Sequence, residues 1–351
     1  MKPMTVRSAF LAAGLSFVCS GELSAAGLAV CTTTPDLAAL TREIGGEHVT
    51  VTSIVSGPQD PHELQVKPSS IKLVHDADVL IVNGLELEAA WLPTILRSAR
   101  NPRLAPGELR FIDASSAVRP LEVPSGPIDR SMGDIHASGN PHFLLDPING
   151  LKVARLIQAR LTSLTPEHAD VYKERFADFT MRCGRALIGE SLVEKRGTKG
   201  VLALVVALDR DGTENTLAAL EATGEREILG GWLGAVARLD HRKLVADHRT
   251  WTYFASRFGL TVVDYLEPKP GITPTTRHLA ELVERMQRDD VHAVLASVYF
   301  DARFTGFVVE HGGARVARVA HQVGARDGSD NYLAMVDYNV REVLAVCGEK
   351  R

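Results

Sequence analysis

The chain has 351 residues, of which 45% are hydrophobic and 23% charged, and its formal net charge is -4. This length suffices for two domains of ordinary size, and the composition is that of a globular protein. Acidic and basic residues are mixed along the sequence, so it lacks the concentrated basic face of a nucleic-acid-binding protein. We therefore expect no nucleic-acid partner.

The first 26 residues have the pattern of a secretory signal peptide. Basic residues precede a short apolar run, Ala9 to Cys19, and small residues end at Ala26, where we expect cleavage. A membrane anchor is the alternative, but the run is shorter than the roughly 20 apolar residues that span a bilayer. Val18 precedes Cys19, whereas lipidation requires a small residue at that place. We expect a periplasmic protein without a lipid anchor.

Three cysteines, Cys31, Cys183 and Cys347, remain after this cleavage. In an oxidising compartment an odd number leaves at least one free thiol. Cys183 and Cys347 both lie in helix-like segments and could form a disulfide, or all three could be buried thiols. The sequence does not distinguish these alternatives.

Residues 27–146 show the alternation of strand and helix that is typical of a parallel sheet covered by helices. The run 79–82 is entirely apolar, as expected for a strand that is buried on both faces. Strands are predicted at 28–32, 49–55 and 79–82, and helices at 37–44, 68–74 and 89–98. We predict that residues 27–146 form one αβ lobe, the N-terminal metal-binding lobe.

Residues 147–196 have a helical pattern that is interrupted only near Thr165 and Pro166. We interpret this segment as one long rigid helix that links two lobes, with an ordinary domain helix as the alternative. Residues 197–351 return to the αβ alternation, although 202–208 could be a strand or a buried helical turn. Further strands are predicted at 243–246, 260–265, 291–296 and 315–319, and helices at 251–258, 276–287, 304–310 and 332–346. The predicted fold class is α/β, with two lobes that each contain a mostly parallel sheet flanked by helices.

Four histidines share one context, because each directly follows a predicted strand or extended segment. His62 and His142 also follow a proline, whose fixed φ presents the next side chain on a stiff turn. His248 and His321 come from the second lobe. Neutral imidazole is a preferred ligand of zinc and other late first-row metals. We predict that these four residues bind one metal ion between the lobes, whereas the other eight histidines, among them His136, receive no role.

A ligating imidazole normally donates its second N–H to a carboxylate or carbonyl group. The acidic residues nearest in sequence are Asp60, Glu63, Asp146 and Asp247. Capping of turns and helices is the competing explanation, and it is favoured for Asp146 because Pro147 follows it at a helix start.

The segments Asp60-Pro61-His62-Glu63 and Asn140 to Pro147, together with Asp247 to Phe254, resemble the metal-binding segments of a known family. This is the cluster A-I family, the solute-binding proteins of zinc and manganese ABC importers. The segment Glu267 to Pro274 is similar to a further segment of one branch. The resemblance runs from about Leu28 to the C-terminus, and it implies a buried metal between two lobes and delivery of that metal to a membrane permease.

The family's fourth ligand is usually an acidic residue in a late loop. In this chain His321 stands at or beside that position, and Asp301 is the alternative. Zinc members often carry a long His-rich loop before the second Pro-His segment, but here that loop is short and contains only Asp134 and His136. Manganese members replace the third histidine with a carboxylate, whereas His248 is retained. Because imidazole-rich sites favour zinc or copper over manganese, we expect Zn²⁺.

We therefore expect a monomeric, extracytoplasmic zinc-binding protein, not an enzyme, that delivers the ion to an ABC permease. A manganese-binding component and an adhesin of the same fold are alternatives. A secreted zinc hydrolase is disfavoured because catalytic zinc requires an open position, and the chain has no His-Glu-x-x-His helix.

Overall fold

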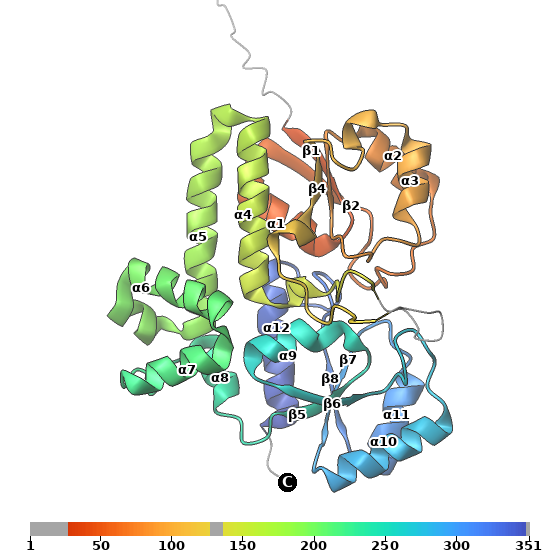
Figure 1. The fold of residues 1–351 in the computed structure, drawn as a ribbon, viewed down its shortest axis with the longest axis vertical. Helices are drawn as coiled ribbons and strands as arrows, with labels where there is room; N and C mark the ends of the chain where they lie inside the picture. Colours follow the sequence, from red (N-terminus) through yellow and green to blue (C-terminus); the bar gives the residue numbers. More distant parts are fainter. Residues whose placement is uncertain (1–26, 127–135, 349–351) are drawn as a thin grey trace, which may run out of the picture.

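The computed structural model describes residues 27–126 and 136–348, which form two lobes (Figure 1). The expected signal peptide, 1–26, and Asp134 lie outside the described residues. Within the described ranges, the helices are all too short or too polar to cross a membrane. Cys31, Cys183 and Cys347 are free, buried thiols, so Cys183 and Cys347 are not paired in this structure.

The N-terminal lobe is built on a parallel sheet with the strand order β2-β1-β3-β4. Its strands are β1 (Leu28–Thr32), β2 (Val49–Ser53), β3 (Val79–Val82) and β4 (Phe111–Asp113), and its helices are α1 (Pro35–Gly45), α2 (Pro68–Asp76) and α3 (Leu92–Ala99). All four residues of β3 are buried, as its apolar run predicts. The short strand β4 was not predicted, because only three residues carry it and only Ile112 among them is buried.

The C-terminal lobe repeats this topology, with the order β6-β5-β7-β8 and all neighbouring strands parallel. Its strands are β5 (Lys243–Ala246), β6 (Thr261–Tyr265), β7 (Ala293–Ala296) and β8 (Arg315–Arg318), and its helices are α9 (Thr252–Phe258), α10 (Thr276–Arg288), α11 (Ala302–Gly312) and α12 (Tyr332–Cys347). The prediction of two αβ lobes with parallel sheets is confirmed.

The connection between the lobes differs from the single long helix expected over 147–196. It consists of α4 (Pro147–Leu164) and α5 (Ala169–Ile188), which pack side by side against α1 (Figure 1). Thr165 breaks the helix with φ -139° and ψ 72°. The physical reason is Pro166, which disfavours helical geometry at the residue before it and has no backbone N–H to donate. The chain therefore turns back on itself.

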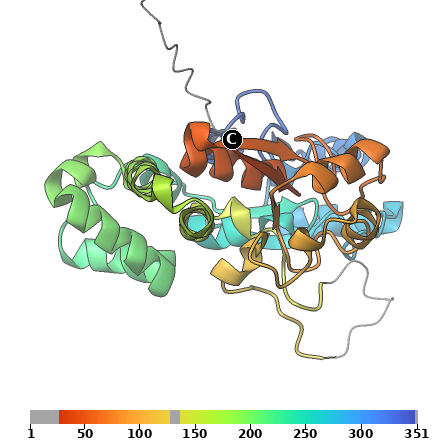
Figure 2. The same ribbon diagram turned by 90° about the horizontal axis from the view of Figure 1, so that it is seen from above.

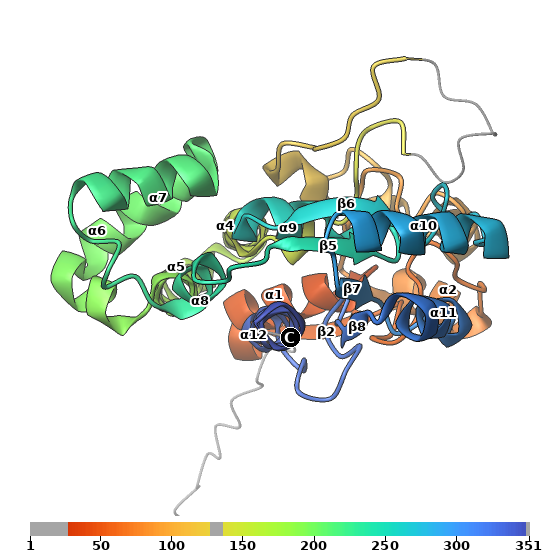
Figure 3. The ribbon, with the colours of Figure 1, turned by 90° about the horizontal axis from the view of Figure 1, so that it is seen from below.

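Three further helices follow α5, in the region where the sequence pattern was ambiguous. They are α6 (Glu190–Arg210), α7 (Gly212–Ala222) and α8 (Gly231–Ala237). Residues 202–208 are helical and belong to α6. Figures 2 and 3 show α6 and α7 on the outer side of α4 and α5, away from both sheets.

The two lobes share one large hydrophobic cluster, and each lobe also has a smaller cluster of its own. A continuous cluster of buried side chains includes Val30 and Ile81 from the first sheet, and Leu244 and Leu295 from the second. Met335 on α12 belongs to the same cluster. Because closely packed interiors resist deformation, this shared core fixes the relative position of the loops that emerge between the lobes.

Candidate metal centre

His62 is held by the loop that follows β2. Its Nδ1 lies 2.9 Å from Asp60 Oδ1, and the same oxygen accepts a hydrogen bond from the His62 backbone N–H at 2.9 Å. Trp91, itself buried, donates from Nε1 to the Pro61 carbonyl at 3.0 Å. These contacts commit Nδ1 to Asp60 and leave Nε2, which is buried without a hydrogen-bond partner. Nε2 is therefore available to bind a metal, while the Asp60 carboxylate orients the ring through Nδ1.

His142 is positioned by residues of both lobes. Asn140 Oδ1 accepts from the His142 backbone N–H at 2.9 Å, and Tyr253 of α9 donates its hydroxyl to the Asn140 carbonyl at 2.9 Å. Burial, followed by the neighbouring His62 and His248, holds the pKa of His142 well below its ordinary value of 6.5. The imidazole is therefore neutral at neutral pH, and its Nε2 is buried and unbonded.

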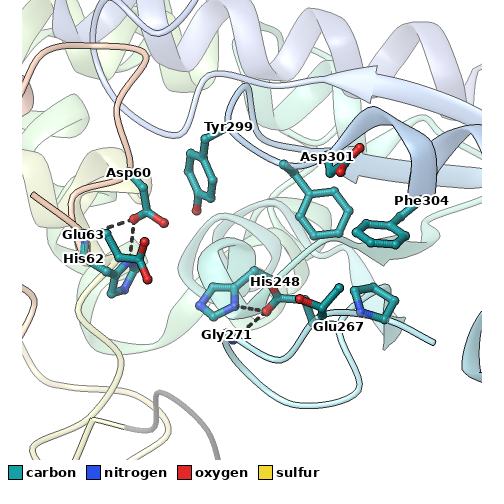
Figure 4. Close-up of a pocket in the computed structure, with 12 residues that line it drawn as sticks. Asp60, His62, Glu63, His248, Glu267, Gly271, Tyr299, Asp301 and Phe304 are labelled. Atoms are coloured by element: carbon teal, nitrogen blue, oxygen red, sulfur yellow. Dashed lines mark hydrogen bonds and ion pairs between the residues drawn. The ribbon is translucent and has the colours of Figure 1, made fainter.

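His248 follows β5 and belongs to the second lobe. Its Nδ1 lies 2.7 Å from Glu267 Oε2, which also accepts from the Gly271 backbone N–H at 2.9 Å (Figure 4). Burial acts to lower the pKa of His248, but the hydrogen bond and charge of Glu267 outweigh it, so that the net pKa is raised. Asp247, one of the four candidate acidic residues, instead accepts hydrogen bonds from backbone N–H groups and from Trp251 Nε1.

The other two acidic candidates have no contact with the imidazoles. Asp146 caps α4 through the Ile148 N–H and forms a buried ion pair with Arg257, in agreement with the capping alternative. Glu63 is exposed at the edge of the cavity beside His62.

The three imidazoles of His62, His142 and His248 converge between the lobes. One nitrogen from each lies within 4.8 Å of the other two, and the ring centroids are 5.0–5.9 Å apart. A tetrahedral ion with nitrogens at about 2.0–2.1 Å requires ligand atoms about 3.4 Å apart, so small side-chain adjustments bring these nitrogens to bonding distance. A cavity of about 230 Å³ beside His62 and His248 gives access to the centre. Residues of both lobes thus form a candidate metal centre.

His321 and Asp301, the two residues expected to provide the fourth ligand, lie outside this group. The Nε2 of His321 is 3.0 Å from the Gln59 carbonyl, while its Nδ1 is buried without a partner beside Tyr299. Asp301 caps α11 through the Arg303 N–H and forms an ion pair with the Arg303 side chain. Its side chain is 40% exposed, and it lines the cavity beside His62 and His248 while it is paired with Arg303.

His136, to which the sequence analysis assigned no role, lies beside this group of three imidazoles. Its ring centroid lies 5.4 Å from that of His62, and its Nε2 is buried without a hydrogen-bond partner. It lines a cavity of about 370 Å³ together with His142 and His248. Burial and the nearby His62 and His248 lower its pKa to about 4, so it is a neutral nitrogen donor. No local pattern marks His136, because neither a proline nor a sequence pattern typical of a strand directly precedes it.

The family model described as "Zinc-uptake complex component A periplasmic" (ZnuA) matches residues 30–186 and 226–346. The chain belongs to this family. The residues between the two matched ranges, 187–225, contain α6 and α7, so these helices lie outside the part that the family model describes.

Relatives of this ZnuA-family chain include proteins named for different metals. The manganese ABC transporter substrate-binding lipoprotein PsaA of Streptococcus pneumoniae is 21% identical over 92% of this chain and 90% of that protein. The zinc-binding lipoprotein AdcA of Streptococcus pneumoniae is 21% identical over 86% of this chain and 50% of that protein. A crystal structure of ZnuA matches with a TM-score of 0.66 and 18% identity, over 92% of this chain and 99% of that chain, which supports the fold.

Proposed function

We propose that this protein is an extracytoplasmic binding protein that captures Zn²⁺ and delivers it to an ABC import permease. The observation that carries the proposal is the convergence of His62, His142 and His248 from the two lobes. Membership of the ZnuA family and the name of PsaA support the role in transport, and the name of AdcA supports zinc as a ligand. The ion is the transported substrate, and the protein acts as a monomer outside the cytoplasm after removal of residues 1–26.

Zinc is favoured over manganese by the donor atoms. Imidazole nitrogens suit zinc, whereas manganese prefers carboxylate and water oxygens. The two carboxylates closest to the imidazoles, Asp60 and Glu267, each bond to an Nδ1 atom and therefore orient a ligand without occupying the centre. A centre of this composition retains manganese weakly.

For the fourth position we propose His136 ahead of His321. The Nε2 of His136 is unbonded and borders the same cavity as His142 and His248. The Nε2 of His321 is committed to the Gln59 carbonyl, although its Nδ1 is free of a hydrogen bond. Four imidazoles would complete a tetrahedral shell, which leaves no open position for a catalytic water. We therefore favour a binding protein over a zinc hydrolase.

Competition with a chromophoric zinc chelator tests this proposal. We expect one tightly bound zinc per chain, much weaker manganese binding, and a loss of at least tenfold in zinc affinity for His142→Ala. His311→Ala is the matched control, because His311 is an exposed histidine on α11 whose Nδ1 bonds only to the Phe307 carbonyl of its own helix. The proposal fails if the wild-type protein binds no zinc, or if both variants bind it equally well.

A further inference from the structure

The turn that follows β3 has an unusual backbone. Gly84, Leu85 and Glu86 have φ angles of +85°, +50° and +66°. Residues with a side chain are disfavoured in this left-handed region, where glycine is the usual choice. Leu85 and Glu86 therefore occupy positions at which glycine would relieve strain.

A buried carboxylate holds this turn in place. Glu88 accepts hydrogen bonds from Thr33 Oγ1 at 2.5 Å, from the Asn83 N–H at 2.6 Å and from the Gly84 N–H at 3.2 Å. Its side chain is 4% exposed. Asn83 in turn donates from Nδ2 to the Pro141 carbonyl at 2.9 Å, next to His142. The strained turn is thus tied to the metal centre on one side.

Glu86 connects the turn to a second segment, which directly follows His136. Its Oε2 accepts from the Ala137 backbone N–H at 2.7 Å, and its Oε1 accepts from Ser138 Oγ at 3.0 Å. Both carboxylate oxygens therefore hold the two residues that directly follow His136. Hydrogen bonds to a charged acceptor are stronger than neutral ones, and two of them on one exposed carboxylate restrict the segment more than one would.

We propose that Glu86 is a positioning residue that keeps His136 over the centre formed by His62, His142 and His248, and so slows release of the bound ion. The inference rests on the proposed function. The left-handed backbone at Glu86 directs the carboxylate toward Ala137 and Ser138, which gives a reason for a strained non-glycine residue at this place. A ligand on a fixed segment loses little freedom on binding, whereas a ligand on a loose segment dissociates readily.

The zinc dissociation rate tests this role. Zinc-loaded wild-type protein and variants are mixed with excess chelator, and release is followed by stopped-flow absorbance. We expect Glu86→Gly to release zinc at least about tenfold faster, as typical for loss of a group that supports a metal ligand. His136→Ala should show a similar increase. The double variant should be no faster than His136→Ala, because both substitutions act through the same bond between His136 and the ion.

Leu85→Gly is the matched control, because it relieves the neighbouring left-handed residue and leaves the carboxylate in place. It should release zinc at the wild-type rate. The inference is overturned if Glu86→Gly releases zinc at the wild-type rate, if Leu85→Gly is equally fast, or if the two single effects multiply in the double variant. Absence of zinc binding by the wild-type protein would instead refute the proposed function, so the two failures are distinguishable.

Discussion

Gln322 links the second lobe to the segment that precedes His62. Its side-chain amide, buried between the lobes, donates from Nε2 to the carbonyls of Ser56, Gly57 and Gln59 at 2.9–3.0 Å. These residues lead into Asp60 and His62. We predict that Gln322→Met, which keeps a side chain of similar length and removes the donor, destabilises the protein and weakens zinc binding.

The magnitude follows from counting donors and acceptors. An amide nitrogen has two hydrogens, so three carbonyls share two bonds. The Ser56 carbonyl also accepts from the Gln59 N–H, and the Gln59 carbonyl is within hydrogen-bond distance of His321 Nε2. The Gly57 carbonyl depends on Gln322. Losing two bonds at about 1 kcal/mol each, with one carbonyl left unsatisfied, predicts a loss of about 2–4 kcal/mol of unfolding free energy.

Urea unfolding of the metal-free protein measures this loss. Gln287→Met is the matched control, because the exposed amide of Gln287 donates to the His311 carbonyl at 3.3 Å and its removal should cost less than about 0.5 kcal/mol. Gln322→Met should also weaken zinc binding about tenfold, since the segment before His62 loses its anchor. The reasoning is refuted if both variants unfold at the same urea concentration and with the same slope as the wild-type protein.

Three further predictions concern other buried groups. Burial raises the pKa of Asp36 from 3.8 to about 7, against the hydrogen bond from the Val323 N–H. The folded state therefore binds the proton more tightly than the unfolded state. The destabilisation caused by the buried, ionised carboxylate is fully present above pH 7 and disappears as the pH falls toward 4. Asp36→Asn should raise the unfolding free energy at pH 8 by up to about 4 kcal/mol, and this gain should vanish near pH 4. Urea unfolding at the two pH values measures the gain, and a gain that does not depend on pH would contradict the prediction. Glu267→Ala should weaken zinc binding about 10–100-fold in the chelator competition, because His248 Nδ1 loses its acceptor, and unchanged affinity would rule this out. Burial raises the pKa of Cys183 to about 12, so the three described thiols should react with a thiol reagent only after denaturant is added, and rapid reaction of the native protein would argue against their burial.

The sequence alone was sufficient to predict most of the strands and helices. The all-apolar run of β3, the alternation of strand and helix in both halves, and the Pro-His turns at His62 and His142 are local patterns, and the structure contains each of them. Local patterns depend on residues that are neighbours along the chain, so they can be read without knowledge of packing. The helical pattern over 147–196 was recognised, but the consequence of Pro166, a reversal of the chain, was not.

The composition of the centre was decided by tertiary structure. His136 carries no local signal, and it becomes a candidate ligand because the fold brings its ring beside His62, with Glu86, about fifty residues earlier, bonded to the segment that follows it. Glu267, and not the adjacent Asp247, supports His248, because the strand order brings β6 beside β5. His321 is in the expected loop, but its Nε2 contacts the opposite lobe. Periodicity determines the face on which a side chain lies, whereas the packing of two lobes determines which side chains meet.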